Sequence, residues 1–364
     1  MEQKEVRRCK VSKKKYVNVI MALLATMIVP VYLYGVQVLY IALTAVITAV
    51  VVDFLCLRIA REKIWRKHDF SFIVTALISA MFFPATVPLW IVVISISISI
   101  VIAKYPFGGQ GYNIFNPSAV GIAFVAICWP EYVLRYPIPQ TLKAVTDSSL
   151  VSYGASPASV LQVGGTPKIG FIDVFLGNFA GPIGTTCMLV LAACLLYLVL
   201  RKTVSLRIFL SALLVVGLVA ILFPRLVTGR WSSLLYEGCS GGLIFGLIFM
   251  AGDPVTVPKT KSGQILFGLI LGSIVMLFRH FGTVELDFVF AILIANIFAI
   301  PCDSYAHYIR KKLDKFFPDD KFGKNKKTND LTIGEKKDKQ KLVEVVEIVD
   351  EKDEEKDENI TINF

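Results

Sequence analysis

The stretch FGGQGYNIFNPSAVGIAF, residues 107–124, stands between two strongly apolar segments. It contains four glycines, two asparagines and a proline. Glycine and Asn-Pro steps are typical of turns, whereas lipid offers no hydrogen-bond partner to an interrupted backbone. The stretch is therefore either a tight turn between membrane helices or a broken backbone that faces a ligand instead of lipid. The residues alone leave both interpretations open.

The composition of the whole chain favours a membrane protein. Of its 364 residues, 55% are hydrophobic and 18% are charged, and the mean hydropathy is +0.64. The charged residues gather at the N-terminus, at 58–69 and after residue 310. The apolar runs between them have about 20 residues, the length of a spanning helix. Because a soluble protein has no means of covering so much apolar surface, we expect an all-α polytopic membrane protein.

Charge and cysteine usage narrow the function further. The net charge is +10, but the basic residues lie beside the apolar runs, where they orient a chain in the bilayer, so we expect no nucleic-acid partner. The seven cysteines include no C-x-x-C pair, which argues against a zinc or iron–sulfur site within this chain.

Ten helical spans are predicted, of which the third is short and the sixth begins with a partial helix. They cover residues 17–35, 37–57, 70–84, 88–104, 117–133, 172–200, 206–223, 233–252, 264–279 and 284–305. Ten spans divide into two halves of five, and an odd number per half inserts the halves in opposite orientations. This is the geometry of an inverted repeat, whose sites lie between the halves on broken helices.

A second glycine-rich stretch supports the repeat. GCSGGLIFGLIFMAGDPVTVPKT, residues 238–260, pairs Gly-Gly with Asp253-Pro254, as the first stretch pairs Gly-Gly with Asn116-Pro117. Since Asp-Pro and Asn-Pro steps are typical of turns anyway, two plain turns remain the alternative.

Lysine and arginine counts predict the topology. Seven of them precede residue 16, and five lie between Leu57 and Asp69, whereas the turn at 34–36 has none. Cytoplasmic segments are enriched in these residues, so both termini are predicted to be cytoplasmic and the loop 134–171 outside. Arg225, Arg230 and Arg279 are exceptions to this bias.

The chain is thus divided into five parts. They are a cytoplasmic basic segment 1–16, a first five-helix half 17–133, an outward loop 134–171, a second five-helix half 172–305 and a cytoplasmic charged tail 306–364, which is expected to be disordered or partly helical.

Three motifs carry a family resemblance. FGGQGYNIFNPSAVG, DVFLGNFAGPIGTTC and FMAGDPVTVPKTKSGQILFG resemble, in order and spacing, segments of the family that comprises RnfD, from the Rnf electron-transport complex, and NqrB, from the Na+-translocating NADH:quinone oxidoreductase. The resemblance runs from about residue 17 to 305 and implies a ten-helix flavoprotein that is not catalytic alone. It implies FMN tied through its phosphate to a hydroxyl in the outward loop, placed there by a flavin transferase, and riboflavin or another flavin bound non-covalently.

The resemblance also implies the site residues. The stretch Ser152–Pro157 matches the attachment motif, with Ser156 at the position where the family has Thr, and Thr185 stands where the family has an acidic residue. The predicted cofactor-binding residues are Ser152, Ser156, Gly108, Gly109, Asn113, Asn116, Asp173, Asn178, Asp253 and Thr256.

Several of these residues have a structural alternative. Gly108 and Gly109 would let the backbone approach a ring or a helix closely. Asn116 would cap the fifth span instead of contacting a ligand. Asp253 would cap its own turn, which does not exclude contact with a flavin or an ion. Asp53 is expected to pair with Arg58 or to handle a proton or Na+. Arg279 and His280 are expected to snorkel or to contact a partner protein.

The resemblance places the chain in a complex whose other subunits bind the soluble substrates, ferredoxin and NAD or NADH and quinone, and which moves Na+ or H+. Two alternatives remain open. One is a related component of a flavin-based system that passes electrons to extracellular acceptors without pumping. The other is a small-solute channel or transporter of inverted-repeat type.

Overall fold

A computed structural model describes residues 12–60, 70–109, 111–139, 151–225, 229–282 and 285–316. The chain divides into two compact units, Met1–Ile309 and Arg310–Phe364, and all of the described helices except the last lie entirely within the first. Most of the basic segment, loop residues 140–150 and the tail beyond residue 316 lie outside the described residues, so the expectations for them stay predictions.

The described part of the chain is mostly helical and has only two short strands, which confirms the predicted fold class. Three helices are long and apolar enough to cross a membrane, two bent helix pairs pass the same test as one span each, and five shorter apolar helices have 10–17 residues. In chain order these segments fall one for one on the ten predicted spans.

The first half contains α1 (Lys13–Thr26) continued by α2 (Ile28–Tyr34), α3 (Gln37–Ile59), α5 (Ser71–Phe82), α6 (Leu89–Val101) and α7 (Pro117–Cys128). The second half contains α11 (Met188–Leu200), α12 (Leu206–Leu222), α13 (Arg230–Cys239) continued by α14 (Leu243–Phe249), α15 (Lys261–Phe281), and α16 (Asp287–Ile297) continued by α17 (Ala299–Phe316). The connection between the halves holds α8 (Pro130–Val133), β1 (Tyr136–Pro137), β2 (Tyr153–Gly154), α9 (Pro157–Gln162) and α10 (Phe171–Leu176), with β1 and β2 antiparallel.

Prolines end several helices short of the predicted spans. The α5 helix stops at Phe82 because Phe83 precedes Pro84 and takes an extended conformation, with ψ 155°. The α7 helix stops at Cys128 because Trp129 precedes Pro130 and leaves the helical region. A helix of 12 residues is about 18 Å long, less than the hydrocarbon thickness of about 30 Å, so non-helical backbone must complete these crossings inside the protein.

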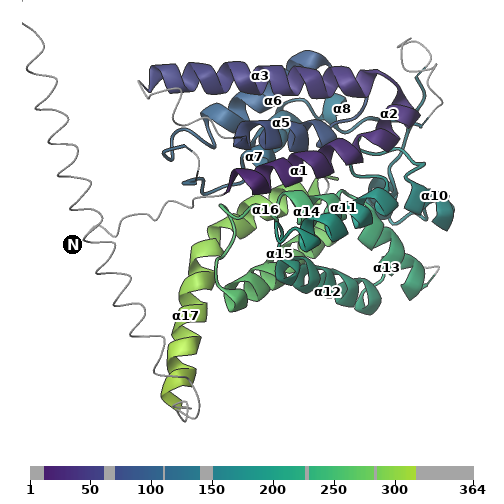
Figure 1. Ribbon diagram of the computed structural model, residues 1–364. Helices are drawn as coiled ribbons and strands as arrows, with labels where there is room; N and C mark the ends of the chain where they lie inside the picture. Colours follow the sequence, from purple (N-terminus) through teal and green to yellow (C-terminus); the bar gives the residue numbers. More distant parts are fainter. Residues whose placement is uncertain are drawn as a thin grey trace, which may run out of the picture. The chain divides into compact units, whose positions relative to one another are not determined.

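The two halves make equivalent contacts. In the first half α3 packs on α5 and α6, and α6 packs on α7; in the second half α12 packs on α13 and α15, and α15 packs on α16. Between the halves, α1 packs on its counterpart α11 and α7 packs on its counterpart α16 (Figure 1). A two-fold relation brings equivalent elements together at its axis, so the packing supports the repeat that span parity predicted.

Each half also donates hydrogen bonds to carbonyl groups at a broken helix end in the other half. The backbone N–H groups of Ile183 and Gly184 donate to the carbonyls of Phe83 and Met81 at the end of α5, over 2.9 and 2.8 Å. In return, the Asn116 amide donates to the Met250 carbonyl after α14, over 3.2 Å. The final carbonyls of a helix have no partner within it, and these bonds supply one without help from water.

Glycines allow the closest helix contacts. A Cβ atom at Gly121 of α7 would lie 2.3 Å from the Ser95 carbonyl oxygen on α6. In the second half, a Cβ atom at Gly268 of α15 would lie 2.7 Å from the Ile208 carbonyl oxygen on α12. Small residues let membrane helices approach at backbone distance, and this packing holds the helices together where lipid provides no hydrophobic driving force.

This packing predicts a position-specific effect of adding one methyl group. Gly121→Ala is expected to destabilise the protein by about 1–3 kcal/mol because α6 and α7 must move apart. Gly238→Ala is the control, since a Cβ atom there meets nothing within 4 Å and the change is expected to be neutral or stabilising by about 0.5–1 kcal/mol. Thermal unfolding in detergent measures both, and equal melting temperatures would contradict the close contact.

Candidate functional site

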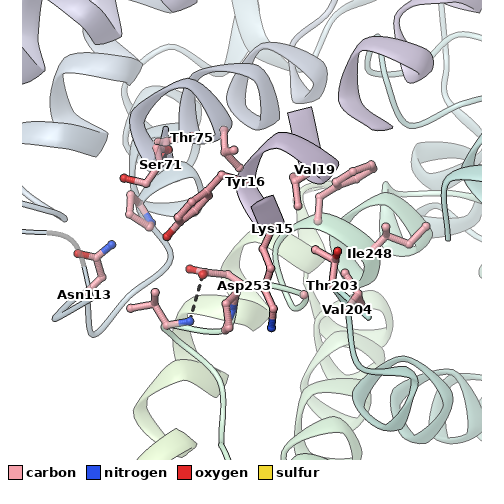
Figure 2. A pocket seen from close by; sticks show the side chains of 16 residues that line it. Lys15, Tyr16, Val19, Ser71, Thr75, Asn113, Thr203, Val204, Ile248 and Asp253 are labelled. Carbon is pink, nitrogen blue, oxygen red and sulfur yellow. Dashed lines mark hydrogen bonds between the residues drawn. The ribbon is translucent and has the colours of Figure 1, made fainter. Parts of the chain in front are cut away.

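One pocket lies where the two halves meet and is built from helix starts and connecting loops. Its polar lining residues are Lys15, Tyr16, Ser71, Thr75 and Asn113 from the first half and Thr203 and Asp253 from the second (Figure 2). The interface pocket, defined by these residues, has a volume of about 60 Å³, which is room for a few water molecules. The two glycine-rich stretches therefore converge at one place between the halves.

Asp253 is the only acidic side chain among the described residues that line the interface pocket. Its carboxylate accepts hydrogen bonds from the Val255 N–H over 3.1 Å and from the Thr256 hydroxyl over 3.4 Å, which confirms the predicted cap. No salt bridge joins it to a basic side chain in the part of the chain that the structure describes. Burial raises the pKa of Asp253 from 3.8 to about 6, and the bonds from Val255 and Thr256 oppose that rise only in part.

The asparagines of the first stretch have separate roles. Asn116 caps α7, as predicted, because its side-chain oxygen accepts from the Ala119 N–H over 3.3 Å, while its amide spans the interface to Met250. The side-chain oxygen of Asn113 is buried and has no hydrogen-bond partner among the described residues. Asn113 thus presents an unused acceptor at the interface pocket.

Gly108 and Gly109 are explained by backbone conformation. Their φ angles are 102° and 80°, in a region that side chains other than glycine rarely adopt. A Cβ atom at Gly109 would meet nothing within 4 Å, so close approach to another group is not what requires glycine there. These two residues end the turn after α6, and neither lines the interface pocket.

Ser156 lies in a second pocket, at the far end of α7 from Asn116. The Ser156 pocket is lined by Tyr136, Ser156, Phe179, Pro182, Thr185, Cys239, Gly241 and Glu285, with a few neighbours. Its volume is about 10 Å³, close to the minimum for one water molecule. The α7 helix alone separates the ends of the bundle by about 18 Å, so the first glycine-rich stretch and Ser156 do not form one site.

The Ser156 hydroxyl is held from two sides. It accepts from the Ser159 N–H over 3.0 Å, which caps α9, and donates to the Glu285 carboxylate over 2.8 Å. Ser156 is 4% exposed, whereas Glu285 is partly exposed. Burial raises the pKa of Glu285, and the hydrogen bonds from Ser156 and Ser159 oppose this rise.

The remaining predicted residues lie in neither pocket. The exposed Ser152 uses its carbonyl to accept from the Ile138 N–H over 2.9 Å, next to the β1–β2 pair. Asn178 donates to the Asp173 carboxylate over 3.3 Å in the turn that ends α10. The structure thus brings Asn113, Asp253 and its partner Thr256 together, but separates them from Ser152, Ser156, Asp173 and Asn178.

Sequence reasoning missed a buried ion network beside the Ser156 pocket. Arg279 is 4% exposed and pairs with Glu237 over 2.9 Å and with Asp287, while Arg225 pairs with the other oxygen of Glu237. The Arg279 guanidinium also donates to the carbonyls of Glu237 and Ser240, where α13 breaks from α14. The predicted snorkelling of Arg279 is therefore wrong, because the guanidinium closes the broken helix inside the bundle.

The predicted pairing of Asp53 with Arg58 is also wrong. Asp53 does not pair with Arg58, which is exposed, but with Lys104 over 2.9 Å and with the Tyr105 hydroxyl over 2.9 Å. Residues five apart lie on different faces of a helix, so Asp53 and Arg58 of α3 point in different directions. Asp53 and Lys104 are both buried, and each neutralises the other between α3 and the turn after α6.

Comparison with known proteins identifies relatives over most of the chain. A model of the NQR2, RnfD, RnfE family matches residues 4–311. The D subunit of a proton-translocating ferredoxin:NAD(+) oxidoreductase complex from Clostridium ljungdahlii is 29% identical over 326 residues, which are 87% of this chain and 93% of the relative.

Two further relatives are subunits of an ion-translocating oxidoreductase complex and of a Na(+)-translocating reductase. The D subunit of an ion-translocating oxidoreductase complex from Actinobacillus succinogenes is 28% identical, over 79% of this chain and 90% of the relative. The B subunit of a Na(+)-translocating NADH-quinone reductase from Pseudomonas paraeruginosa is 34% identical over 254 residues, which are 66% of this chain and 61% of the relative. The match thus covers less than two thirds of that reductase protein but nearly all of the two oxidoreductase proteins.

The ion network predicts a large effect of removing its central cation. Arg279→Met leaves Glu237 with Arg225 alone and removes the cation that pairs with Asp287, and is expected to destabilise the protein by about 3–5 kcal/mol. Arg230→Met is the matched control, because Arg230 is exposed and its loss should change stability by no more than about 0.5 kcal/mol. Melting temperature and yield in detergent are measured for both, and similar values would contradict a central role of Arg279.

The Asp253 carboxylate predicts a pH dependence with a definite sign. Because its folded-state pKa is raised from 3.8 to about 6, the folded protein binds more protons than the unfolded chain between these values. Its contribution to stability is therefore lost as the pH rises from about 4 to about 6. Asp253→Asn keeps an acceptor for Val255, so its melting temperature relative to wild type should rise over this interval. A constant difference between the two proteins would contradict the raised pKa.

Proposed function

Because the chain belongs to the NQR2, RnfD, RnfE family, we propose that it is the flavin-carrying membrane component of an Rnf-type ion-translocating electron-transport complex. The observation that carries the proposal is the match over 93% of the length of a protein from such a complex. In this role the chain passes electrons between neighbouring subunits, which bind the soluble donor and acceptor. It is not a catalyst alone.

The orientation in the membrane is part of the proposal. Both termini lie in the cytoplasm and the connection 134–171 lies outside, as the lysine and arginine counts indicate. The interface pocket then opens to the cytoplasmic end of the bundle and the Ser156 pocket lies at the outer end. A flavin transferase that works outside the membrane meets the residues around Ser156 but not the interface pocket.

The residues at Ser156 fit the phosphate end of FMN. The side chain is a hydroxyl already paired with a carboxylate, and Ala155 beside it is small and exposed. The Arg135 guanidinium lies 4.7 Å from the ring centre of the exposed Tyr153 and offers a cation near the attachment point. The flavin supplies electron transfer when it is bound, whereas the protein holds the phosphate and keeps it at the outer end.

Neither pocket admits an isoalloxazine ring as it stands. Ligand pockets have roughly 300–1,000 Å³, against about 60 Å³ at the interface and about 10 Å³ at Ser156. A flavin on Ser156 therefore keeps its ring outside the Ser156 pocket. The polar groups of the interface pocket match the edge of a flavin, but the volume of the pocket is too small for the ring.

Covalent flavin tests the proposal directly. The full chain is produced with and without a flavin transferase, purified in detergent and run on a denaturing gel. Wild type is expected to give a fluorescent band only with the transferase, and Ser156→Ala is expected to give none, because the hydroxyl that would form the phosphoester is gone. Ser152→Ala is the control, since the exposed Ser152 contributes its carbonyl to the β1–β2 region, and its band should keep full fluorescence.

Absence of flavin from wild type would contradict the proposed carrier role. If such a protein also mediates solute flux in liposomes, it is a channel or transporter of inverted-repeat type. Fluorescence that persists in Ser156→Ala keeps the carrier role but moves the attachment to another residue.

A further inference from the structure

We propose that Glu285 is the general base that activates Ser156 for its own modification by a flavin dinucleotide, so that the acceptor protein contributes a catalytic group to the transfer. This inference rests on the proposed attachment of FMN to Ser156. It assigns a role to a residue that lies 129 positions away in the chain, in the second half of the bundle, whereas Ser156 lies in the connection between the halves.

The geometry is that of an activated nucleophile. The Ser156 Oγ and the Glu285 Oε2 are 2.8 Å apart, with the hydroxyl donating, which is the distance expected between a nucleophile and its base. The Ser159 N–H donates to the same Oγ over 3.0 Å and fixes its position. A serine alcohol is a weak nucleophile at neutral pH and needs such a base to attack phosphorus.

The other groups around the Ser156 pocket do not compete for this role. Asp287 is held by Arg279, and Glu237 is held by Arg225 and Arg279. Tyr136 is a neutral phenol, because burial and the charges of Glu285 and Asp287 raise its pKa well above the ordinary value. Glu285 is therefore the only carboxylate among the described residues that is hydrogen-bonded to the Ser156 hydroxyl.

The step balances without an oxidant or reductant. The Ser156 Oγ attacks the phosphorus on the flavin side of the dinucleotide, an Oγ–P bond forms, and the phosphoanhydride bond to the nucleoside monophosphate breaks. The Ser156 proton moves to the Glu285 carboxylate, and the nucleoside monophosphate leaves. Once protonated, Glu285 no longer repels the phosphate ester and offers it an O–H donor instead.

The burial of Glu285 favours the proton transfer. Desolvation raises its pKa, which brings the carboxylate closer to the pH at which a base works and helps it hold the proton. Glu285 is partly exposed while Ser156 is buried, so the reacting dinucleotide approaches from the side of Glu285.

The rate of flavin attachment tests the inference. Purified full-length protein is incubated in detergent with flavin adenine dinucleotide and a flavin transferase, and covalent fluorescence is followed with time. Glu285→Gln is expected to be flavinylated about 100-fold more slowly, the lower bound for a general base. Glu285→Asp keeps a carboxylate and should recover part of the rate. Glu131→Gln, which neutralises an exposed carboxylate on α8, is the matched control and should react at close to the wild-type rate.

The outcomes separate this inference from the proposed function. If wild type and Glu285→Gln acquire covalent flavin at equal rates, Glu285 is not the base. The attachment at Ser156 would then still stand. Flavin on neither wild type nor any variant overturns the attachment and the base together. If Glu285→Gln elutes as aggregate, the pH profile of wild type decides, measured against the same transferase acting on an unrelated acceptor. A relative rate that rises with pH as a carboxylate titrates supports the base, and a flat one overturns it.

Discussion

A broken helix inside a bilayer leaves backbone polar groups that lipid cannot satisfy, and the fold of this chain depends on satisfying them from within the protein. The end of α5 is closed by N–H groups of the second half, and the end of α14 by the Asn116 amide of the first. The break between α13 and α14 is closed by the Arg279 guanidinium. Because two of these three closures join the halves, each half depends on the other for its broken helix end.

The same constraint creates the two pockets. Where the backbone leaves the helix, side chains that cap it must be polar, and these polar groups line the space between the halves. Asp253 caps its own turn at one end, and Ser156 caps α9 at the other.

Much of the fold follows from local sequence, because span length, proline and glycine act over a few residues. The partial helix before α11 and the short α5 were predicted from apolar runs alone. The caps at Asn116 and Asp253 were predicted from dipeptide chemistry. The ends of α5 and α7 were predicted less well, since the restriction that Pro84 and Pro130 place on Phe83 and Trp129 outweighed the apolar runs that continue past them.

The ion network and the Ser156–Glu285 pair could not be derived from local patterns, because their members lie far apart in the chain. A signal was nevertheless present. Arg225 and Arg279 violate the positive-inside bias, and a cation on the wrong side of a membrane protein requires a partner. Glu237, Glu285 and Asp287 lie near the starts of the predicted spans 233–252 and 284–305, which begin at that same end. Pairing these groups would have identified the network, although not which carboxylate remains for Ser156.

Side-specific labelling measures the arrangement most directly. Cysteines are introduced one at a time at the exposed positions Ser152 and Lys259 in a variant whose seven native cysteines are replaced by alanine, and are treated with a membrane-impermeant maleimide in vesicles of known orientation. We expect the cysteine at 152 to react with the maleimide from the outer side and the cysteine at 259 to react from the cytoplasmic side. Labelling of both from one side would contradict two polar sites at opposite ends of an inverted bundle.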